Sequence, residues 1–380
     1  MEELVRLKAE DYESAIDFLD LVFSQHSAPH HFETRLPRMC IPDDEHMGKH
    51  FAIKYNGRIV SMLGVYPLPV VIGGERFLFS TSGNVATHHR YEGRGYAHRL
   101  LAAAMEELKR IDADASRLGG FRQRYNRFGF EEAGTLYRMN ITQANIKAEP
   151  SPGVTFRTVE ENDTETLEAI QKIQTSAPFY VDRGRLDEFW LTLTAYRACP
   201  VTAYREGKLI GCICASPDGQ TAEEIIAVDA EATEMIVVQW LKDHPVPSVN
   251  INLPVWNVQA IRAMSRLCQT MNITFPSLFK IIHWQRIANA LCRLKSDMTP
   301  LSDGSFTVGI EGQTTLRFIA EGGKATCVAT ADQPDISLDP LAATRFIFGP
   351  QPPWTVAACE SPLAAALLPL PLSWCLQDRV

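Results

Sequence analysis

The sequence predicts an α/β chain with mixed (α+β) sheets, arranged as two tandem copies of one fold followed by a smaller third domain. An amphipathic helix at 97–108 follows a strand-like run and a glycine-containing turn. A hairpin pattern at 51–65 recurs at 201–215, and three short strands follow later in the chain. A chain of 380 residues also has the length of two or three domains.

The first copy begins with a helix predicted at 11–24, which is followed by β-hairpins. Asn56-Gly57 lies between two apolar runs, and an Asn-Gly pair in that setting is a strong signal for a tight hairpin turn. Gly73-Gly74 marks a second turn of the same kind. The predicted strands are 51–55, 58–66, 68–72, 76–80 and 84–87.

The turn before the helix at 97–108 has the composition of a phosphate-binding loop. Gly93 and Gly95 lack a Cβ, so the backbone can approach a ligand, and the helix N-terminus supplies unpaired N–H donors. A dinucleotide fingerprint would need a third glycine where His98 stands, and no Gly-Lys-Ser/Thr of a Walker A loop is present. We therefore expect a pyrophosphate ligand, with a solvated Gly-Arg-Gly turn as the alternative.

The run Glu92-Gly93-Arg94-Gly95-Tyr96-Ala97 resembles the pyrophosphate loop of the GCN5-related N-acetyltransferases (GNAT), Arg/Gln-x-x-Gly-x-Gly/Ala. Glu92 departs from this pattern and brings a negative charge near the phosphates, for which Arg90 and Arg94 can compensate. Downstream, 122–130 resembles the family segment that places a tyrosine just before a Phe-Gly-Phe strand. The order of helix, hairpin, strands, loop and helix agrees with the same family.

This resemblance implies the fold, the cosubstrate acetyl-CoA and a set of site residues. Tyr125 would be the general acid that protonates the departing CoA sulfur, whereas a tyrosine packed at a helix end is the alternative. A β-bulge in the strand 84–87 would free backbone N–H groups for the thioester oxygen. The residues implied to bind the cosubstrate are Val85, Ala86, Thr87, Gly93, Arg94, Gly95, Tyr96, Ala97, His98, Gly120 and Phe121.

The remaining chain divides at a proline-rich connection, 147–153, into two further domains. The second copy lacks a glycine-rich turn, because 223–229 runs directly into a helix, and we expect it to be structural. Three short strands and a helix capped by Asp339-Pro340 then resemble a sterol-carrier-type domain. The predicted domains are 1–146 (catalytic), 154–286 (degenerate copy) and 289–380 (sterol-carrier-like).

This three-part order resembles the enhanced intracellular survival (Eis-like) acetyltransferases. The resemblance implies a homo-oligomer, with a hexamer as one such assembly. It also implies that the C-terminal carboxylate of Val380 is the general base, ionised at neutral pH. The alternative is that Val380 only ends a packed segment and that water or Asp378 takes the proton.

Composition limits which partners the protein is expected to bind and in which cellular compartment it is expected to work. A net charge of −8 gives no basic footprint, so we expect no nucleic acid, and it weakly favours cationic acceptors. No signal peptide or membrane-length apolar run is seen, and nine scattered cysteines indicate free thiols in the cytoplasm. The pairs His30-His31 and His88-His89 lack partner ligands, so we expect no metal.

The sequence thus predicts a cytoplasmic N-acetyltransferase that transfers acetyl directly from acetyl-CoA to an amine of a small molecule or peptide. One alternative is a non-catalytic CoA- or lipid-binding regulatory module. Another is a peptidyl or lipid acyltransferase that uses a longer acyl-CoA. The segment 26–33 and the domain junction would select the acceptor, whose identity stays open.

Overall fold

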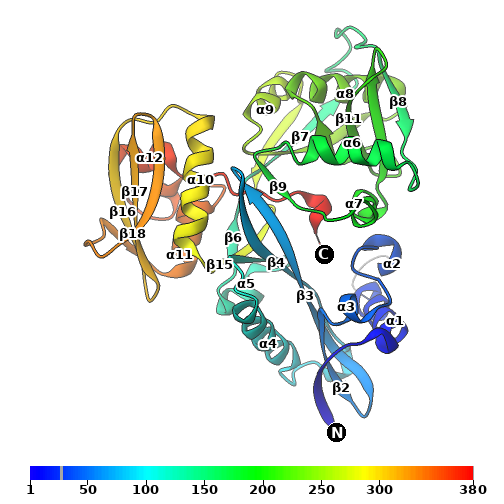
Figure 1. Ribbon diagram of the computed structural model, residues 1–380, viewed down its shortest axis with the longest axis vertical. Coiled ribbons are helices and arrows are strands. Elements are labelled where there is room, and N and C mark those ends of the chain that lie inside the picture. The colour runs from blue at the N-terminus through cyan, green and yellow to red at the C-terminus, as the bar shows by residue number, and fades with distance from the viewer. Residues whose placement is uncertain (26–28, 380) are drawn as a thin grey trace.

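Three β-sheets, each at the centre of one lobe, organise the chain (Figure 1). The computed structural model describes residues 1–25 and 29–379. The sheets have eight, seven and four strands, and each combines with helices. The predicted α/β class with mixed sheets is confirmed.

The first sheet has the strand order β1-β2-β3-β4-β5-β15-β6, with β9 paired to β3. The strands β1 to β4 are antiparallel neighbours, whereas β4 and β5 run parallel. Parallel neighbours need a crossover, which the helix α4 supplies. The strands are β1 (Glu2–Arg6), β2 (His50–Tyr55), β3 (Arg58–Ile72), β4 (Glu75–Thr87), β5 (Ala115–Leu118), β6 (Glu131–Ala133), β9 (Phe179–Val181) and β15 (Ser277–Ile281).

Helices cover both faces of this sheet. Leu100, Leu101 and Leu108 of α4 pack on one face, and Ala15 and Leu19 of α1 pack on the other. Figure 1 shows α4 and α1 on opposite sides of the β3–β4 ribbon. The helices and 3₁₀ turns of this lobe are η1 (Ala9–Asp11), α1 (Tyr12–Ser24), α2 (Phe32–Arg35), α3 (Asp44–Met47), η2 (His89–Tyr91), α4 (Tyr96–Arg110), α5 (Arg122–Tyr125) and η3 (Asn126–Phe128).

The predicted strands 58–66 and 68–72 are one strand, β3, and the predicted strands 76–80 and 84–87 are one strand, β4. β3 continues through Pro67 and Pro69. Both prolines lie between the stretch of β3 paired with β2, which ends at Gly64, and the stretch paired with β9, which begins at Val70. Because β3 has no second neighbour there, the missing proline N–H groups cost no ladder hydrogen bond on that side.

The second sheet has the order β14-β7-β13-β12-β11-β10-β8. The repeated hairpin is confirmed, with β10 and β11 joined at Glu206-Gly207. The strands are β7 (Leu136–Thr142), β8 (Val154–Thr158), β10 (Cys199–Arg205), β11 (Lys208–Ala215), β12 (Thr221–Ala227), β13 (Ser248–Pro254) and β14 (Thr270–Thr274). The helices are α6 (Thr164–Gln174), α7 (Leu186–Leu193), η4 (Ala195–Arg197), α8 (Ala230–Asp243) and α9 (Val258–Ser265).

The first two lobes exchange strands. β7 comes from the first predicted range but pairs with β13 and β14 of the second sheet. β15 comes from the second range but lies between β5 and β6 of the first sheet. The ranges 1–146 and 154–286 therefore do not each contain one whole sheet, and the two lobes are joined through their backbone hydrogen bonds.

The third lobe holds the sheet β18-β17-β16-β19 and packs α10 against it. The three predicted strands are confirmed, as is the helix capped by Asp339, whose carboxylate accepts from the N–H groups of Leu341 and Ala342. The strands are β16 (Gly304–Ile310), β17 (Thr314–Glu321), β18 (Lys324–Thr330) and β19 (Ile336–Leu338). The helices are α10 (Trp284–Met298), α11 (Pro340–Phe348), η5 (Pro353–Thr355), α12 (Pro362–Leu367) and η6 (Leu376–Asp378).

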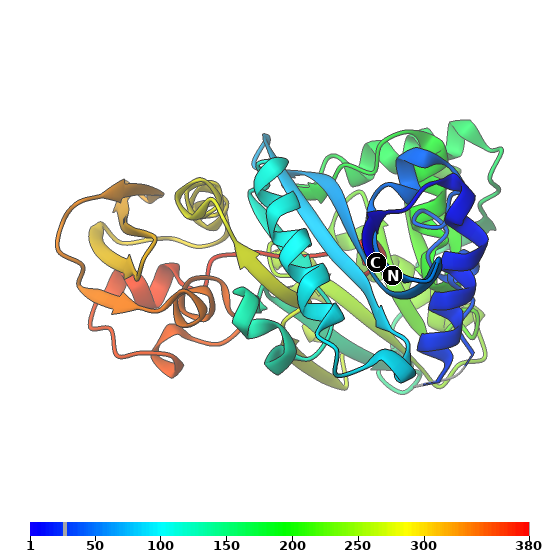
Figure 2. The ribbon, with the colours of Figure 1, turned by 90° about the horizontal axis from the view of Figure 1, so that it is seen from below.

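The C-terminal segment crosses from the third lobe to the junction of the other two, as Figures 1 and 2 show in red. Trp374 is fully buried on the way, with its ring stacked 6.1 Å from the Phe79 ring of β4. Leu370 and Leu372 are buried in the same cluster. This burial ties the tail down and brings the residues up to Arg379 to the first two lobes.

Candidate functional site

The glycine-containing turn before α4 has the conformation that its sequence predicts. Gly93 has φ +75° and Gly95 has φ +77°, a left-handed region that residues with a Cβ adopt only at a cost. A Cβ built on either glycine meets no atom within 4 Å, so the turn borders open space. No side chain caps the start of α4, which leaves its first N–H groups available to an anion.

The corresponding helix of the second lobe, α8, has a different N-terminus. The Asp229 carboxylate accepts a hydrogen bond from the Ala232 N–H at 2.7 Å, so the helix carries its own anion. Both helices follow a strand and lead to its parallel neighbour, β4 to β5 and β12 to β13. Of these two corresponding helices, α4 has the N-terminus without a side-chain cap that a phosphate could occupy.

The sheet opens next to this turn. β4 pairs with β5 from Phe79 to Ser82, and the recorded pairing ends at Ser82–Leu118. On the other side of β4, the register with β3 shifts between Met62 and Gly64. This shift confirms the predicted β-bulge in the strand around 84–87, where backbone groups turn away from the ladder.

A buried hydrogen-bond chain supports the bulge. Asn84, which has φ +55°, donates from Nδ2 to the Tyr66 hydroxyl at 2.8 Å. That hydroxyl lies 2.8 Å from His50 Nε2, and His50 Nδ1 lies 3.3 Å from the Met47 carbonyl oxygen. Burial lowers the pKa of His50 to about 4, so the ring is neutral, accepts at Nε2 and donates at Nδ1. Sequence analysis did not identify this chain, because its members are far apart in sequence.

Tyr125, the predicted general acid, ends the short helix α5 and packs into the α4 side of the first lobe. It is buried in the cluster that includes Leu100 and Leu118, and Val85 of the bulge packs on the same cluster. A Cβ on Gly120, which has φ +131°, would come within 2.9 Å of the Tyr125 ring. Burial raises the pKa of Tyr125, so the phenol keeps its proton at neutral pH.

The other residues predicted to bind the cosubstrate have different environments. Val85 faces the α4 side, and Ala86 packs on the α1 side. The Thr87 hydroxyl lies 2.8 Å from the Ser61 hydroxyl, and the Tyr96 hydroxyl donates to Glu2 Oε1 at 2.5 Å. Arg94 lies over the Tyr91 ring, His98 is beside Phe128, Ala97 is in the first turn of α4, and Phe121 is 68% exposed.

One local prediction needs correction. The segment 128–130 was predicted as a strand, but Phe128 ends the turn η3 and Gly129 is left-handed with φ +85°. The strand β6 begins only at Glu131. A left-handed glycine ends the helical turn and redirects the chain, so strand pairing starts after it.

The helix that carries Tyr125 is linked by ions to the third lobe. The Glu131 carboxylate is fully buried and pairs with Arg122 of α5 and with Arg345 of α11. The distance from Arg345 Nη1 to Glu131 Oε2 is 2.6 Å, and that from Arg122 Nη2 to the same oxygen is 2.7 Å. Sequence spacing gave no sign of this three-residue bridge, since Arg345 lies more than two hundred residues from Glu131.

The tail is anchored by a second buried ion pair. Arg183 is fully buried, with Nε 2.9 Å from Asp378 Oδ1 and Nη2 3.0 Å from Asp378 Oδ2. Nη2 also lies 2.9 Å from Glu224 Oε1. Both oxygens of Asp378 are thus engaged by one guanidinium, which argues against Asp378 as the proton acceptor. Val380, the predicted general base, lies outside the described residues.

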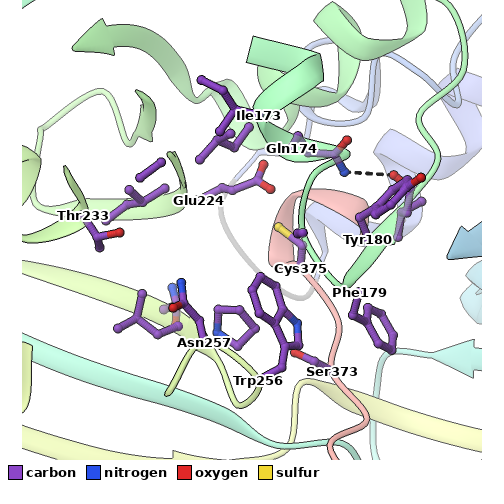
Figure 3. Close-up of a pocket in the computed structure, with 18 of the residues that line it drawn as sticks. Ile173, Gln174, Phe179, Tyr180, Glu224, Thr233, Trp256, Asn257, Ser373 and Cys375 are labelled. Carbon is purple, nitrogen blue, oxygen red and sulfur yellow. Dashed lines mark hydrogen bonds between the residues drawn. The ribbon is translucent and has the colours of Figure 1, made fainter. Parts of the chain in front are cut away.

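A pocket of about 280 Å³ lies in the second lobe (Figure 3). It occupies the place where β12 and β13 separate beyond Ala222–Ile251, in the same relation to α8 as the first opening has to α4. Glu224 and Gln174 lie on one side and Trp256 on the other, and the tail residue Cys375 also lines it. An acidic wall and a capped helix do not suit a pyrophosphate.

Metal-site clusters and membrane-spanning helices are both absent from the described part of the chain. In residues 1–25 and 29–379, no three side chains of His, Cys, Asp or Glu gather as a metal site. Within the same residues, no helix has both the length and the apolar character needed to cross a bilayer. All nine cysteines lie in this part and carry free thiols.

Comparison with known proteins agrees with this geometry. Residues 3–133 match the family model described as an acetyltransferase (GNAT) domain. No curated protein matches the sequence.

Three solved structures share the fold along nearly the whole chain. A GCN5-related N-acetyltransferase from Anabaena variabilis has a TM-score of 0.68 at 15% identity and covers 99% of this chain and 98% of its own. A probable N-acyltransferase from Enterococcus faecalis has a TM-score of 0.67 at 15% identity, with 98% and 97% covered. Eis1 from Mycobacterium abscessus has a TM-score of 0.66 at 15% identity, with 100% of both chains covered.

At this identity the solved structures establish the fold, and the family match covers the lobe that contains the open helix N-terminus and the bulge. The resemblance stated from the glycine turn is thereby supported at the level of the domain. Residues 3–133 therefore match an acetyltransferase domain of the GNAT type in both sequence model and fold.

Proposed function

We propose that this protein transfers the acetyl group of acetyl-CoA directly to an amine of a small molecule or peptide. The observation that carries the proposal is the open N-terminus of α4, with its two left-handed glycines, beside the bulge in β4. Tyr125 packs on the same side of the sheet. These three features would supply phosphate binding, a place for the thioester and an acid within one lobe.

The residues present fit acetyl-CoA. The N–H groups at the start of α4 and the turn at Gly93 and Gly95 would hold the pyrophosphate. Backbone groups of Val85 and Ala86 would line the opening where β4 separates from β5. Acetyl-CoA supplies an acetyl group activated as a thioester.

In the transfer, the amine nitrogen forms a bond to the acetyl carbon and the carbon–sulfur bond breaks. The electron pair of that bond leaves with sulfur, which takes a proton from the Tyr125 hydroxyl, and the amine loses one proton. Backbone N–H groups of the bulge stabilise the developing charge on the carbonyl oxygen. The base that takes the amine proton is predicted to be the carboxylate of Val380, with water as the alternative.

Direct transfer needs no protein nucleophile at the bulge. Cys40 packs on the cluster of Met62 and Ala86 next to the bulge, and burial raises the pKa of its thiol to about 12. A thiol with a raised pKa is a poor nucleophile, since the thiolate is the reactive form.

The homo-oligomer, the cytoplasmic location and the sterol-carrier likeness of 289–380 stay predictions.

Calorimetry of acetyl-CoA binding tests the proposal. We expect binding by the unaltered protein and its loss in Gly95→Glu, which adds a carboxylate where the phosphates would lie. Gly312→Glu is the matched control, because Gly312 has φ +68° and open space around it but lies in the third lobe. Both variants place a glutamate at a left-handed position and so carry similar backbone strain. They differ in whether the added carboxylate lies at the turn before α4.

The outcome that contradicts the proposal is equally defined. If the unaltered protein and Gly95→Glu bind acetyl-CoA alike, the turn is not the phosphate site. If neither protein binds acetyl-CoA, the chain is not an acetyl-CoA-dependent enzyme. If the unaltered protein binds it and Gly95→Glu does not, release of CoA thiol in the presence of amines measures the transfer itself.

A further inference from the structure

A cleft separate from the pocket in Figure 3 lies at the junction of the first two lobes and the tail. Its volume is about 410 Å³. In Figure 1 the helix α2, the end of α7 and the tail meet at this junction. We call it the basic cleft; the described residues that line it are Pro29, His31, Arg35, Tyr196, Arg197, Glu223 and Arg379.

The basic cleft carries an excess of positive charge. Glu223 is the one carboxylate among the described lining residues, and its Oε2 lies 3.2 Å from Arg379 Nη2. Arg35 and Arg197 have no carboxylate partner in the described part of the chain. Two guanidinium groups are therefore uncompensated, although the whole chain has a net charge of −8.

The backbone holds this arrangement in a strained form. Tyr196 has φ +59° and Arg197 has φ +62°, so two consecutive residues with side chains are left-handed. The tail fixes the turn, since Gln377 Nε2 donates to the carbonyl oxygens of Leu193 and Ala195 at 3.0 and 3.1 Å. Strain of this kind persists where surrounding contacts over-determine it, and such positions cluster at functional sites.

Tyr196 organises the arginines of the basic cleft. The guanidinium carbon of Arg379 lies 4.4 Å from the centre of its ring, and that of Arg35 lies 5.5 Å away. A cation over an aromatic face is stabilised by the ring quadrupole, which keeps Arg35 at the cleft without a carboxylate, whereas Arg379 also pairs with Glu223. The N–H donors of Arg35 thus stay available to a ligand.

The basic cleft borders the site of the proposed transfer. Tyr196 packs on the cluster that contains Met62 and Ala86, the pair next to the bulge. Behind the tail, Arg117 of β5 is buried with Nε and Nη1 unpaired among the described residues. Burial lowers the pKa of Arg117 to about 10, which leaves it cationic at neutral pH, and its charge interacts with Tyr196 and Arg379.

We propose that the acceptor amine carries an anionic group, a carboxylate or a phosphate, and that Arg35 and Arg197 of the basic cleft bind it. This proposal rests on the proposed acetyl transfer and names the class of its acceptor. Guanidinium groups present forked donors that match both anions in two-point contacts. The local charge thus reverses the preference for cationic acceptors that the net charge suggested.

Matched acceptor pairs test the proposal. We would compare β-alanine with β-alaninamide and phosphoethanolamine with ethanolamine, and add putrescine as a cationic amine. We expect kcat/KM, measured by CoA release, to be at least tenfold higher for the acid-bearing member of each pair. Binding of the same compounds, measured by calorimetry in the presence of CoA, gives a readout that does not need turnover.

Two substitutions locate the effect at the basic cleft. Arg35→Gln and Arg197→Asn each remove one cation, and asparagine tolerates the left-handed backbone at 197. We expect each to reduce the preference for the acid-bearing member about tenfold, the loss of one charge-assisted contact. Arg262→Gln, at an exposed arginine of α9 without a recorded ion pair, should leave the preference unchanged.

The outcomes separate this proposal from the proposed function. Equal or better binding and turnover of the uncharged amines or putrescine would overturn it while leaving acetyl transfer in place. A preference that survives both arginine substitutions would also overturn it. If acetyl-CoA binds but no amine is acetylated, the proposed function fails, and selective binding of the acid-bearing compounds still decides whether the basic cleft recognises anions.

Discussion

The Asn84 side chain donates a hydrogen bond of 2.8 Å to the hydroxyl of Tyr66, and this contact joins the two strands at the bulge of β4. The Tyr66 hydroxyl can accept from Asn84 because its own proton is directed to His50 Nε2. In this hydrogen-bond chain Asn84 donates, the Tyr66 hydroxyl accepts and donates, and His50 accepts. The bulge at Asn84 is therefore supported by His50, which is far from it in sequence.

Tyr66→Phe removes the central hydroxyl of this chain. Because Asn84 and His50 are then left without their partner in a buried place, we expect the free energy of unfolding to fall by about 1–3 kcal/mol. We also expect kcat of acetyl transfer to fall, since the bulge loses its support. Urea unfolding and CoA release measure the two effects, with Tyr137→Phe of β7 as the control. Unchanged stability and rate would exclude a role for the hydroxyl.

His50 makes stability depend on pH. Its pKa is about 4 in the folded protein and 6.5 as the ordinary value, so the unfolded chain binds the proton first as pH falls. Stability is therefore full above about pH 6.5 and is lost towards pH 4, in total by about 3 kcal/mol. About 2 kcal/mol should be lost by pH 5.

Urea unfolding at pH 7.5 and pH 5 measures this loss. In His50→Gln, the difference between the two pH values should shrink by that amount. The exposed His89→Gln is the control and should retain the difference. An equal pH dependence in His50→Gln and the unaltered protein would contradict the assignment.

Tyr125→Phe tests the general acid. The ring and its packing stay, so acetyl-CoA binding should change little, while kcat should fall roughly a hundredfold. Burial raises the pKa of Tyr125 above its ordinary value of 10, so its ionisation should not reduce the rate between pH 7 and 10. CoA release and calorimetry check both points, with Tyr204→Phe as the control. A variant with full turnover would remove Tyr125 from the mechanism.

Glu131→Gln tests the link between the third lobe and the helix of Tyr125. The substitution removes the charge that pairs with Arg122 and Arg345, and we expect a loss of about 2–3 kcal/mol in stability. The neighbouring Glu132→Gln, whose carboxylate has no recorded ion pair, should cost less than 0.5 kcal/mol. Thermal and urea unfolding compare the two. Equal effects would show that the bridge contributes nothing specific.

Asp378→Asn tests the anchor of the tail. It leaves Arg183 buried with one carboxylate partner, Glu224, and breaking a buried pair of this kind costs about 3–5 kcal/mol. The tail should then become sensitive to proteases. Asp187→Asn breaks the exposed pair with Arg185, which solvent screens, and should change stability far less. Similar losses in both variants would contradict the role of burial.

Elements with local signals could be predicted from the sequence. The hairpin at Asn56-Gly57, its repeat at Glu206-Gly207 and the helix capped by Asp339 each depend on neighbouring residues, and all three are present. The glycine turn before α4 was predicted for the same reason, because positive φ at Gly93 and Gly95 is a property of glycine itself.

Contacts between distant segments could not be predicted in this way. The exchange of β7 and β15 between sheets has no local signal, since each strand is compatible with either partner. The pairing of Arg183 with Asp378 spans nearly two hundred residues. Such pairs form only where the fold brings two distant segments together. Composition and periodicity do not indicate which segments will meet.

The sequence by itself determined the α/β class, the repeated hairpin and the left-handed glycine turn before α4, because these follow from short-range stereochemistry and from alternating apolar residues. Only the tertiary structure decided the local positive charge of the basic cleft. Arg35 and Arg197 come from different lobes, and their charges add only after folding has brought α2 and η4 together at the tail. Net charge is a sum over the whole chain, whereas a ligand responds to the few charges within a screening length of it.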